Sequence, residues 1–306
     1  VAYVEPRGEK ELRWVLSDDL RERRNVICCP DEIVVGAGLQ SLLQSLCPLI
    51  RERKTVSFPT PSFIQGSTIF EEYGFDVHYR DKNCYVIDVS PAHMTKWGEI
   101  MPVKRRLELI HHAEANNHLI IEDDFENEFV YLQKPTPSLF GLAGGENVVY
   151  IGSFSRLLLP SIRVSFMVLP SSLRELYAPK ASFYNQTASK AEQIALCQFI
   201  RDGHLASQVR KSRKIHLAKA EKLADSAKKI LGKDVDVQVG AAGFMVQLTF
   251  AEDCAAEKIA ENAKAKGMTF LEVEKNRMLL TCAGVSAEKY EDAMKLLREC
   301  TEKGMN

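Results

Sequence analysis

Three short segments of the chain carry polar residues of the kinds that bind a charged ligand. The glycine turn GAG, residues 36–38, follows an apolar run and precedes a helical one. Glu122, Asp123 and Asp124 end another apolar run, and residues 152–163 read GSFSRLLLPSIR. Taken singly, each segment also fits a plain structural role, because glycine turns, acidic turns and Ser-bearing loops are common in solvated connections.

The chemistry that these residue types support is the binding of a phosphate and of a cationic ring. Backbone N–H groups at the start of a helix hold phosphates. The hydroxyls of Ser153 and Ser155 and the guanidinium groups of Arg156 and Arg163 suit the same anion. A carboxylate at a buried strand end can face a cationic ring nitrogen, whereas the alternative for the acidic run is a solvated turn.

The elements around these segments indicate how they are positioned. A strand that enters a glycine turn is predicted at residues 32–38, and further strands at 55–58, 77–79, 84–87, 118–121, 148–151 and 163–169. Helices are predicted at 9–23, 39–50, 67–73 and 102–116, the second of which is expected to stop near Pro48. Alternation of apolar strands with helices predicts a mostly parallel α/β sheet that is covered on both faces. Ligands of such sheets bind beyond the carboxyl ends of the strands, which is where the three segments fall.

The pattern changes after Pro170. A helical region at residues 187–231 is interrupted at Gly203, and strands are predicted at 235–239, 243–250, 268–271 and 278–281. A helix at 254–266 and a final helix capped by Ser286 complete an α+β arrangement. We therefore expect a large domain at 1–175, a connecting helical region at 176–214 and a small domain at 215–306.

Composition narrows the function classes. The 306 residues are 45% hydrophobic and 26% charged, with a net charge of −1, so the chain offers no basic surface for nucleic acid. No stretch is apolar enough to enter a membrane and no signal-like start is present, so a cytoplasmic protein is expected. The eight cysteines form no C-x-x-C pair. Reduced thiols, mostly in the core, are expected, and no metal site is predicted.

Seven stretches, two of which contain segments described above, carry a resemblance over nearly the whole chain. They are Y-x-E-P-x-G-x-x-x-L-R at 3–13, FEEYGF at 70–75, MPVKRRLELI at 101–110, IIEDDFENEF at 120–129, PSLFGL at 137–142, YIGSFSRLLLPSIR at 150–163 and FIRDGHL at 199–205. In order and spacing the chain resembles fold type I pyridoxal-phosphate (PLP) proteins of the class I aminotransferase kind. It is most similar to the effector domains of MocR/GabR-type bacterial transcriptional regulators of the GntR family.

The resemblance implies a role for each residue of the three segments. Asp123 would be the partner of the pyridine nitrogen of PLP, and Phe63 would occupy the aromatic position near its ring. The residues that would form the phosphate cup are Gly36, Ala37, Gly38, Ser153, Ser155 and Arg163.

Other positions depart from the family pattern. The Schiff-base lysine falls on Arg156, whose guanidinium stays charged and cannot form a Schiff base with an aldehyde. The tyrosine that would donate to the cofactor oxygen falls on Phe125, and the polar residue of the H-Q-x-P-x-G loop falls on Met94. The arginine that would bind a substrate carboxylate falls on Leu279, and the histidine of the A-G-L-H segment falls on Met245.

The expected function is that of an effector-sensing and dimerisation domain of a MocR/GabR-like regulator. Its PLP site would be degenerate, with no catalytic residue, with PLP bound non-covalently or absent, and with a small anionic ligand in the cleft. The resemblance implies a homodimer, and contact with DNA only through an N-terminal winged-helix domain that we expect to lie upstream of Val1. Two alternatives remain open: a PLP-dependent aminotransferase whose lysine has been changed to Arg156, and a dimerisation scaffold without a ligand.

Overall fold

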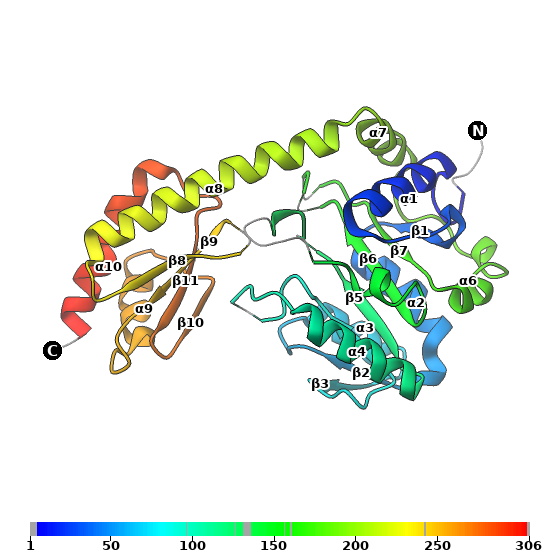
Figure 1. Ribbon diagram of the computed structural model, residues 1–306, viewed down its shortest axis with the longest axis horizontal. Coiled ribbons are helices and arrows are strands. Elements are labelled where there is room, and N and C mark those ends of the chain that lie inside the picture. The colour runs from blue at the N-terminus through cyan, green and yellow to red at the C-terminus, as the bar shows by residue number, and fades with distance from the viewer. Residues whose placement is uncertain are drawn as a thin grey trace. The chain divides into compact units, whose positions relative to one another are not determined.

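The computed structural model describes residues 5–95, 97–125, 127–130, 136–155, 157–159, 161–241 and 243–304. These residues fall into two compact units (Figure 1). The first takes its residues from Val1–Thr95, Ile100–Asn127 and Thr136–Ala206, and the second from Lys96–Glu99, Glu128–Pro135 and Ser207–Asn306. The three-part division predicted from the sequence remains a prediction.

The first unit is built from alternating strands and helices. Its strands are β1 (Ile33–Gly36), β2 (Thr55–Phe58), β3 (Asp76–Tyr79), β4 (Val86–Val89), β5 (Leu119–Asp123), β6 (Val148–Ser153) and β7 (Ser165–Val168). Its helices are α1 (Lys10–Arg24), α2 (Leu39–Ile50), α3 (Ile64–Glu72), α4 (Val103–Asn116), α5 (Leu139–Leu142), α6 (Ser171–Tyr177) and α7 (Lys190–Arg201). Short 3-10 turns lie at Pro30–Glu32, Arg51–Arg53, Asn127–Phe129 and Ala181–Phe183.

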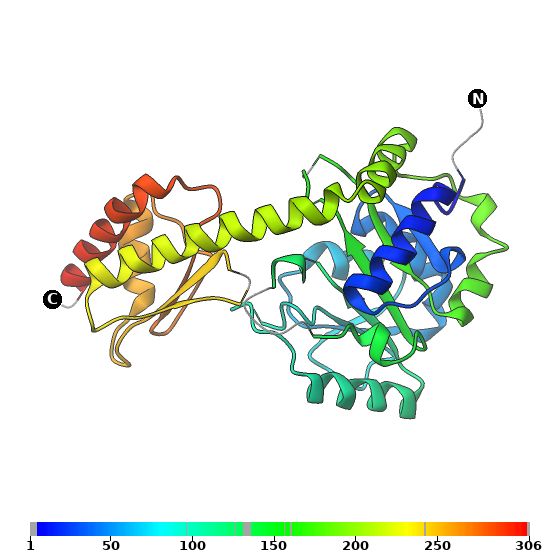
Figure 2. The same ribbon diagram turned by 45° about the horizontal axis from the view of Figure 1, so that its top comes forward.

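All seven strands form one sheet, which runs through the middle of the unit (Figures 1 and 2). The strand order is β1-β7-β6-β5-β4-β2-β3. The five strands β2, β3, β4, β5 and β6 are mutually parallel. Within this sheet, β7 runs antiparallel to both of its neighbours, β1 and β6. The predicted fold class, a mostly parallel α/β sheet, is therefore confirmed.

Helices cover both faces of this sheet because successive strand residues point to opposite sides. On one face, the alternate residues Val34, Val56, Ile121 and Met167 pack with α2, α3 and α6 in one buried cluster. The other face lies under α1, α4, α5 and α7, with contacts of α1 to β1, α4 to β5 and α5 to β6. We call these the α2–α3 face and the α1–α4 face.

The second unit has the α+β texture predicted for the C-terminal part of the chain. Its elements are α8 (His204–Leu231, which begins in the first unit), β8 (Asp236–Val239), β9 (Met245–Thr249), α9 (Ala256–Ala265), β10 (Glu272–Glu274), β11 (Arg277–Thr281), a 3-10 turn at Ala287–Lys289 and α10 (Tyr290–Gly304). The four strands form an antiparallel sheet in the order β10-β11-β9-β8. Its core joins the sheet to α8, α9 and α10 through residues such as Leu223, Leu248, Ile259 and Leu297.

Three details differ from the sequence prediction. The strand expected at 268–271 is wrong: β10 begins at Glu272, where it pairs with Leu279 of β11. Pro48 lies inside α2, whose last residue is Ile50, because a proline in the last turn removes only one backbone bond. Ser286 precedes a 3-10 turn and makes no capping hydrogen bond through its side chain.

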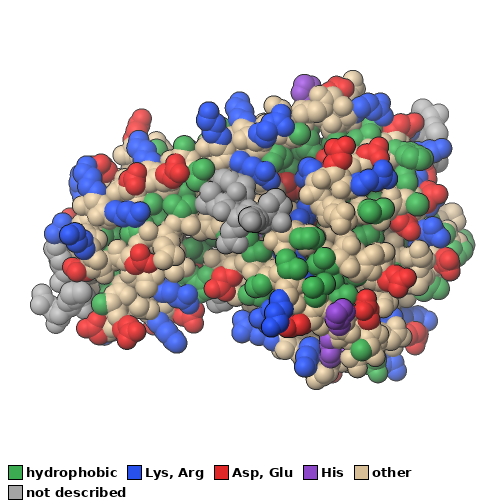
Figure 3. All heavy atoms as spheres, in the orientation of Figure 1, with side chains coloured by type: hydrophobic (Ala, Val, Ile, Leu, Met, Phe, Trp, Pro, Cys, Tyr) green, Lys and Arg blue, Asp and Glu red, His purple; other side chains and the backbone are tan. Residues whose placement is uncertain are grey.

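The composition-based expectations can be compared with the surface and the thiols. All eight cysteines are free and six are buried, as predicted. None of the described helices combines the length and the apolar character that crossing a bilayer requires. On the face shown in Figure 3, Lys and Arg side chains are interspersed with Asp and Glu over most of the surface, and one group of Lys and Arg side chains gathers along the upper edge.

Candidate functional site

The sheet register brings polar residues of three strands into one row. Gly36 of β1 pairs with Ser165 of β7, and Ser165 pairs with Ser153 of β6. Alternation places all three on the α2–α3 face, because Val34, Met167 and Ile151, two residues away from each, belong to its core. The Ser165 hydroxyl donates to Ser153 Oγ at 2.9 Å. The row thus ends the strands at the edge where the sequence predicted a ligand.

Two carboxyl groups continue this row on the next strands. Asp123 is the last residue of β5, and its neighbour Ile151 lies two residues before Ser153. Asp88 of β4 pairs with Ile121, so Asp88 and Asp123 share the α2–α3 face one step apart. The Asp88 side chain is only 4% exposed. Burial, together with the charge of Asp123, raises its pKa well above the ordinary value of an aspartic acid.

The glycine turn that joins β1 to α2 receives the side chain of Arg163. Gly38 has φ +86°, a left-handed conformation that glycine adopts freely, and it stands at the N-cap of α2. A Cβ atom at Gly38 would lie 2.3 Å from Nη2 of Arg163, so the guanidinium group rests directly on this turn. The predicted neighbours Gly38 and Arg163, 125 residues apart by their numbers, therefore meet.

The amide groups of this turn are partly engaged inside the chain. The Ala37 N–H donates to Thr187 Oγ1 at 2.9 Å, and the Gly38 N–H donates to the Gly36 carbonyl at 3.0 Å. The first N–H groups of α2 have no carbonyl partner within their own helix, as at any helix start. An anion at this turn would consequently be held by the first turn of α2 and by Arg163 rather than by the Ala37 amide.

The serine loop after β6 is folded on itself. The Ser155 hydroxyl donates to the Ile162 carbonyl at 3.0 Å, and the Ser155 N–H donates to Ser153 Oγ at 3.4 Å. Both hydroxyl oxygens keep lone pairs and rotate, so they retain the capacity to exchange these bonds for bonds to a ligand. Arg156, the position that corresponds to the Schiff-base lysine, lies outside the described residues.

The two aromatic residues predicted near the ring have different surroundings. The ring of Phe125 stacks on that of His93, with centroids 4.7 Å apart and planes at 18°. The ring of Phe63 packs edge-on against Phe58 and over Gly66, where a Cβ atom would lie 2.1 Å from it. Phe63 thus packs against residues of β2 and α3. Phe125 packs against His93, in the loop that also carries Met94.

Glu122 and Asp124, the two neighbours of Asp123 in the acidic run, are bonded to other parts of the first unit. Glu122 is fully buried and accepts the N–H groups of Leu139 and Phe140, both at 2.9 Å. Burial and the charge of Asp124, opposed by these bonds and by Arg24, raise the Glu122 pKa to about 7. Asp124 accepts from Arg24 at 2.7 and 3.1 Å and from the Tyr150 hydroxyl at 2.6 Å. A solvated turn is therefore wrong for Glu122 and Asp124, which are structural acids.

A cavity of about 340 Å³ opens beside Asp88 at the carboxyl ends of β2 and β4. Its lining includes the predicted position Met94, and three cationic side chains contribute to it: Arg80, Lys82 and Arg105. These three residues are exposed, whereas Asp88 is buried at the strand end. Among the described residues, no hydrogen bond or ion pair reaches the Asp88 carboxyl group. The carboxyl group of Asp88 can therefore form hydrogen bonds with a ligand.

Sequence reasoning missed Asp88, Ser165 and this cavity. The signal for Asp88 was present, because VIDV places an acid inside an otherwise apolar strand. Ser165 becomes informative only through its register with Ser153 and Gly36. Met245 of β9 and Leu279 of β11 belong to the second unit, and Leu279 is buried. Their predicted roles in the site stay predictions.

Comparison with known proteins gives this geometry a context. The chain is 30% identical over 95% of its length to the HTH-type transcriptional regulator YdeL of Bacillus subtilis, of which it covers 67%. It is 24% identical over 86% of its length to the probable rhizopine catabolism regulatory protein MocR of Rhizobium meliloti, of which it covers 56%. The chain thus spans about three fifths of the curated relatives that it matches.

Solved structures support the same assignment at the level of the fold. A kynurenine aminotransferase from Pyrococcus horikoshii, solved in complex with PMP, superposes with a TM-score of 0.77 at 21% identity, over 100% of this chain and 83% of the other. No protein-family model matches the chain. With its aminotransferase-like sheet and its likeness to these regulators, the chain belongs to the MocR-type family of HTH transcriptional regulators, as their aminotransferase-like domain.

Proposed function

We propose that this domain senses an effector and dimerises within a transcriptional regulator, and that its cofactor site is a degenerate PLP site that binds a small anionic ligand. The observation that carries the proposal is the contact between Arg163 and the Gly38 turn, beside the hydroxyl row. It combines a fixed positive charge with the start of a helix, an arrangement suited to a phosphate or carboxylate.

The residues present fit one half of PLP. The first turn of α2, Arg163 and the hydroxyls of Ser153 and Ser155 would hold its phosphate, and Asp123 would face its ring nitrogen. When PLP is bound to a lysine it supplies an electron sink for reactions of amino acids. The sequence has Arg156 at that position, so no amine is present there for covalent attachment of PLP. Phe125 stands in place of a phenol donor.

The cavity beside Asp88, at the ends of the neighbouring strands β2 and β4, also favours the binding of an anionic ligand. Arg80, Lys82 and Arg105 surround it with positive charge, while Asp88 offers a buried carboxyl group. Because its pKa is raised, this carboxyl group is more often protonated than an exposed one and can then donate a hydrogen bond to the ligand. A carboxylate or phosphate with a polar body would fit these groups.

The test is equilibrium binding of PLP and of inorganic phosphate to the full 306-residue chain, measured by calorimetry. We expect binding of both, and at least a tenfold loss in Arg163→Met, since one charge-assisted bidentate contact is removed. Arg21→Met, at an exposed arginine of α1, is the matched control. Absence of PLP and phosphate binding would favour the scaffold without a ligand.

The quaternary part of the proposal is tested separately. We propose a homodimer, and DNA contact only through a part of the regulator outside this chain, because the net charge of −1 leaves no basic footprint. Sedimentation should give a dimer at micromolar concentration, and a gel shift with the chain alone should give no salt-sensitive, sequence-selective complex. A monomer, or such a complex, would contradict this part.

A second candidate is an aminotransferase in which lysine has been changed to Arg156, and the fold likeness to aminotransferases favours it. Arg156→Lys separates the two. If the site is degenerate, PLP should become fixed to the chain by borohydride in this variant, yet amino-group transfer should stay slow because Phe125 lacks the phenol. Rapid turnover in Arg156→Lys would establish the enzyme instead.

A further inference from the structure

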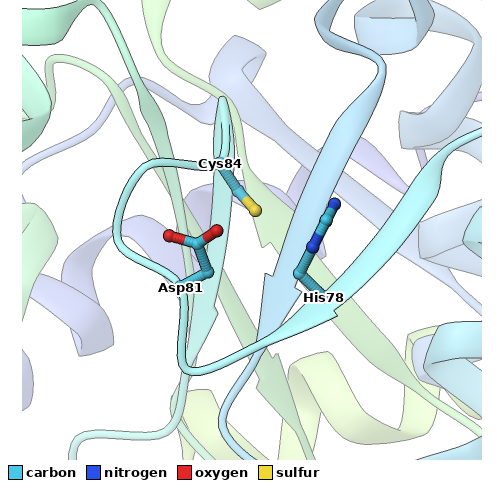
Figure 4. A group of neighbouring side chains, drawn as sticks. All are labelled: His78, Asp81 and Cys84. Carbon is cyan, nitrogen blue, oxygen red and sulfur yellow. The ribbon is translucent and has the colours of Figure 1, made fainter.

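Three side chains with metal-binding atoms gather at the connection between β3 and β4, and one of them, Asp81, also lines the cavity beside Asp88. They are His78 of β3, Asp81 in the connection and Cys84 just before β4. Figure 4 shows the imidazole, the carboxylate and the thiol turned toward a common space. One nitrogen, one oxygen and the sulfur all lie within 4.8 Å of one another.

This separation is close to that of a loaded zinc site. Zinc binds sulfur at about 2.3 Å and nitrogen or oxygen at about 2.0–2.2 Å, which places tetrahedral ligand atoms roughly 3.3–3.8 Å apart. The gap closes by small side-chain rotations, because His78 is 40% exposed and Asp81 is half-buried. The buried Cys84 would then be the fixed ligand to which the other two adjust.

The imidazole of His78 already has the second contact that metal-bound histidines make. Its Nε2 lies 3.0 Å from the carboxylate oxygen Oδ2 of Asp76, two residues earlier on the same strand face. A carboxylate that accepts one ring N–H holds the other nitrogen unprotonated and orients the ring. This contact leaves Nδ1 as the nitrogen for a metal ion.

The connection itself is held in place by hydrogen bonds. The Asp81 N–H donates to Ser57 Oγ at 2.9 Å, and the Tyr85 N–H donates to Thr55 Oγ1 at 2.9 Å. The Asn83 N–H donates to Asp81 Oδ1 at 2.9 Å, which leaves Oδ2 of the same carboxylate for coordination. The site therefore needs little ordering when a metal binds.

From these contacts we infer that His78, Asp81 and Cys84 form a three-ligand site for a zinc-class divalent cation. Thiolate, imidazole and carboxylate together suit Zn²⁺ and its spectroscopic substitute Co²⁺, and disfavour Ca²⁺ and Mg²⁺, which take oxygen ligands. The exposed side of the imidazole leaves a fourth position for water. The inference does not rest on the proposed function, although Asp81 also lines the cavity beside Asp88, and the spectrum of the bound metal distinguishes the two.

The competing explanation is that each group has only its local role. Burial, with the charges of Asp81 and Asp76, raises the pKa of Cys84, and Thr55 contacts its thiol. A neutral thiol with a hydroxyl neighbour and a surface His–Asp pair is stable without a metal. The two explanations differ in whether the three residues act together.

The experiment is a Co²⁺ and Zn²⁺ titration of the full, reduced chain. We expect one Co²⁺ per chain, with a near-ultraviolet sulfur-to-cobalt band and visible bands of a tetrahedral ion. Added Zn²⁺ should displace the Co²⁺ and remove both kinds of band. Cys84→Ser should abolish the sulfur band. His78→Ala should weaken Zn²⁺ at least tenfold, and Asp76→Asn should weaken it about 10–100-fold through the orientation of the ring.

Cys29→Ser is the matched control, because Cys29 is an exposed free cysteine in another part of the first unit. It should retain the band and the affinity. Far-ultraviolet circular dichroism of each variant checks that it folds. The inference is overturned if the chain gives no sulfur band with Co²⁺, or if the band persists in Cys84→Ser and disappears in Cys29→Ser.

Discussion

At β5, the two faces of the sheet give acidic residues different surroundings. On the α1–α4 face, Glu122 accepts two backbone N–H groups, and beyond the strand end Asp124 is bonded to Arg24 and Tyr150. On the α2–α3 face, Asp123 lies one step from a second acid, Asp88, whose charge interaction with it is unfavourable. Both faces bring two acids close together, but on the α1–α4 face backbone N–H groups and Arg24 compensate them, whereas Asp88 on the α2–α3 face has no described hydrogen bond or ion pair.

The difference teaches how to separate structural from ligand-facing polar residues. A buried polar group with a complete set of partners stabilises the fold, since leaving it unpaired costs free energy. A buried acid such as Asp88, beside a cavity and without a described partner, lowers the stability of the empty domain. Such a cost is typical of a binding site.

The largest expected effect breaks the paired face. Arg24→Met should lower the free energy of unfolding by about 3–5 kcal/mol, because Asp124, 1% exposed, is left as an uncompensated buried charge. Urea denaturation of the full chain measures it. Arg21→Met, at the exposed pair with Asp18, should stay within about 1 kcal/mol of the parent. Equal effects in the two variants would remove the distinction between the faces.

The sequence predicted the strand ends at which the candidate site is placed, but not the hydrogen bonds and burial of the acids there. The strand ends at Gly36, Asp123 and Ser153 follow from local patterns, since apolar runs and glycine turns are read from neighbouring residues. The burial of Glu122 and Asp124 depends on partners at Leu139 and Arg24, and no pattern in IIEDDFENEF reveals these distant contacts. The cluster of His78, Asp81 and Cys84 depends in the same way on the shape of one connection.

The second prediction concerns the ligand-facing side and pH. The folded chain keeps a proton on Asp88, whose pKa is raised by burial and by Asp123, whereas the unfolded chain releases it near an ordinary pKa of about 3.9. Stability should therefore fall as pH rises from this ordinary value through the raised pKa. Asp88→Asn carries no such proton, so its stability relative to the parent should increase with pH.

Urea unfolding of both proteins between about pH 5 and pH 8 measures this difference. Glu122, with its pKa of about 7, adds a fall of the same sign in both proteins and cancels in the comparison. Asp18→Asn, at an exposed acid of α1, is the control and should give a nearly flat difference. A parent that gains stability over Asp88→Asn as pH rises would show that Asp88 has an ionic partner.

A third prediction separates backbone strain from ligand binding at the glycine turn. Gly38→Ala and Gly144→Ala should each cost about 1 kcal/mol, because both glycines have positive φ, +86° and +64°. Only at Gly38 does the added methyl group meet Arg163; nothing lies within 4 Å at Gly144. Phosphate binding should therefore fall in Gly38→Ala alone. Equal loss of binding in both variants would place the anion elsewhere.

The smallest expected effect tests whether the hydroxyl row is a closed structural pair or a ligand surface. The Ser165 hydroxyl donates to Ser153 Oγ, so Ser153→Ala leaves a buried donor and should cost about 1 kcal/mol. Ser153→Ala with Ser165→Ala removes both partners and should cost no more than the single change, a coupling that a double-mutant cycle in urea detects. If the row also binds the ligand, both variants should lose phosphate affinity although the double variant recovers stability. Recovery of stability with unchanged phosphate binding would assign Ser153 and Ser165 to the fold, and the ligand-facing residues on this face would then be the Gly38 turn, Arg163 and the two acids.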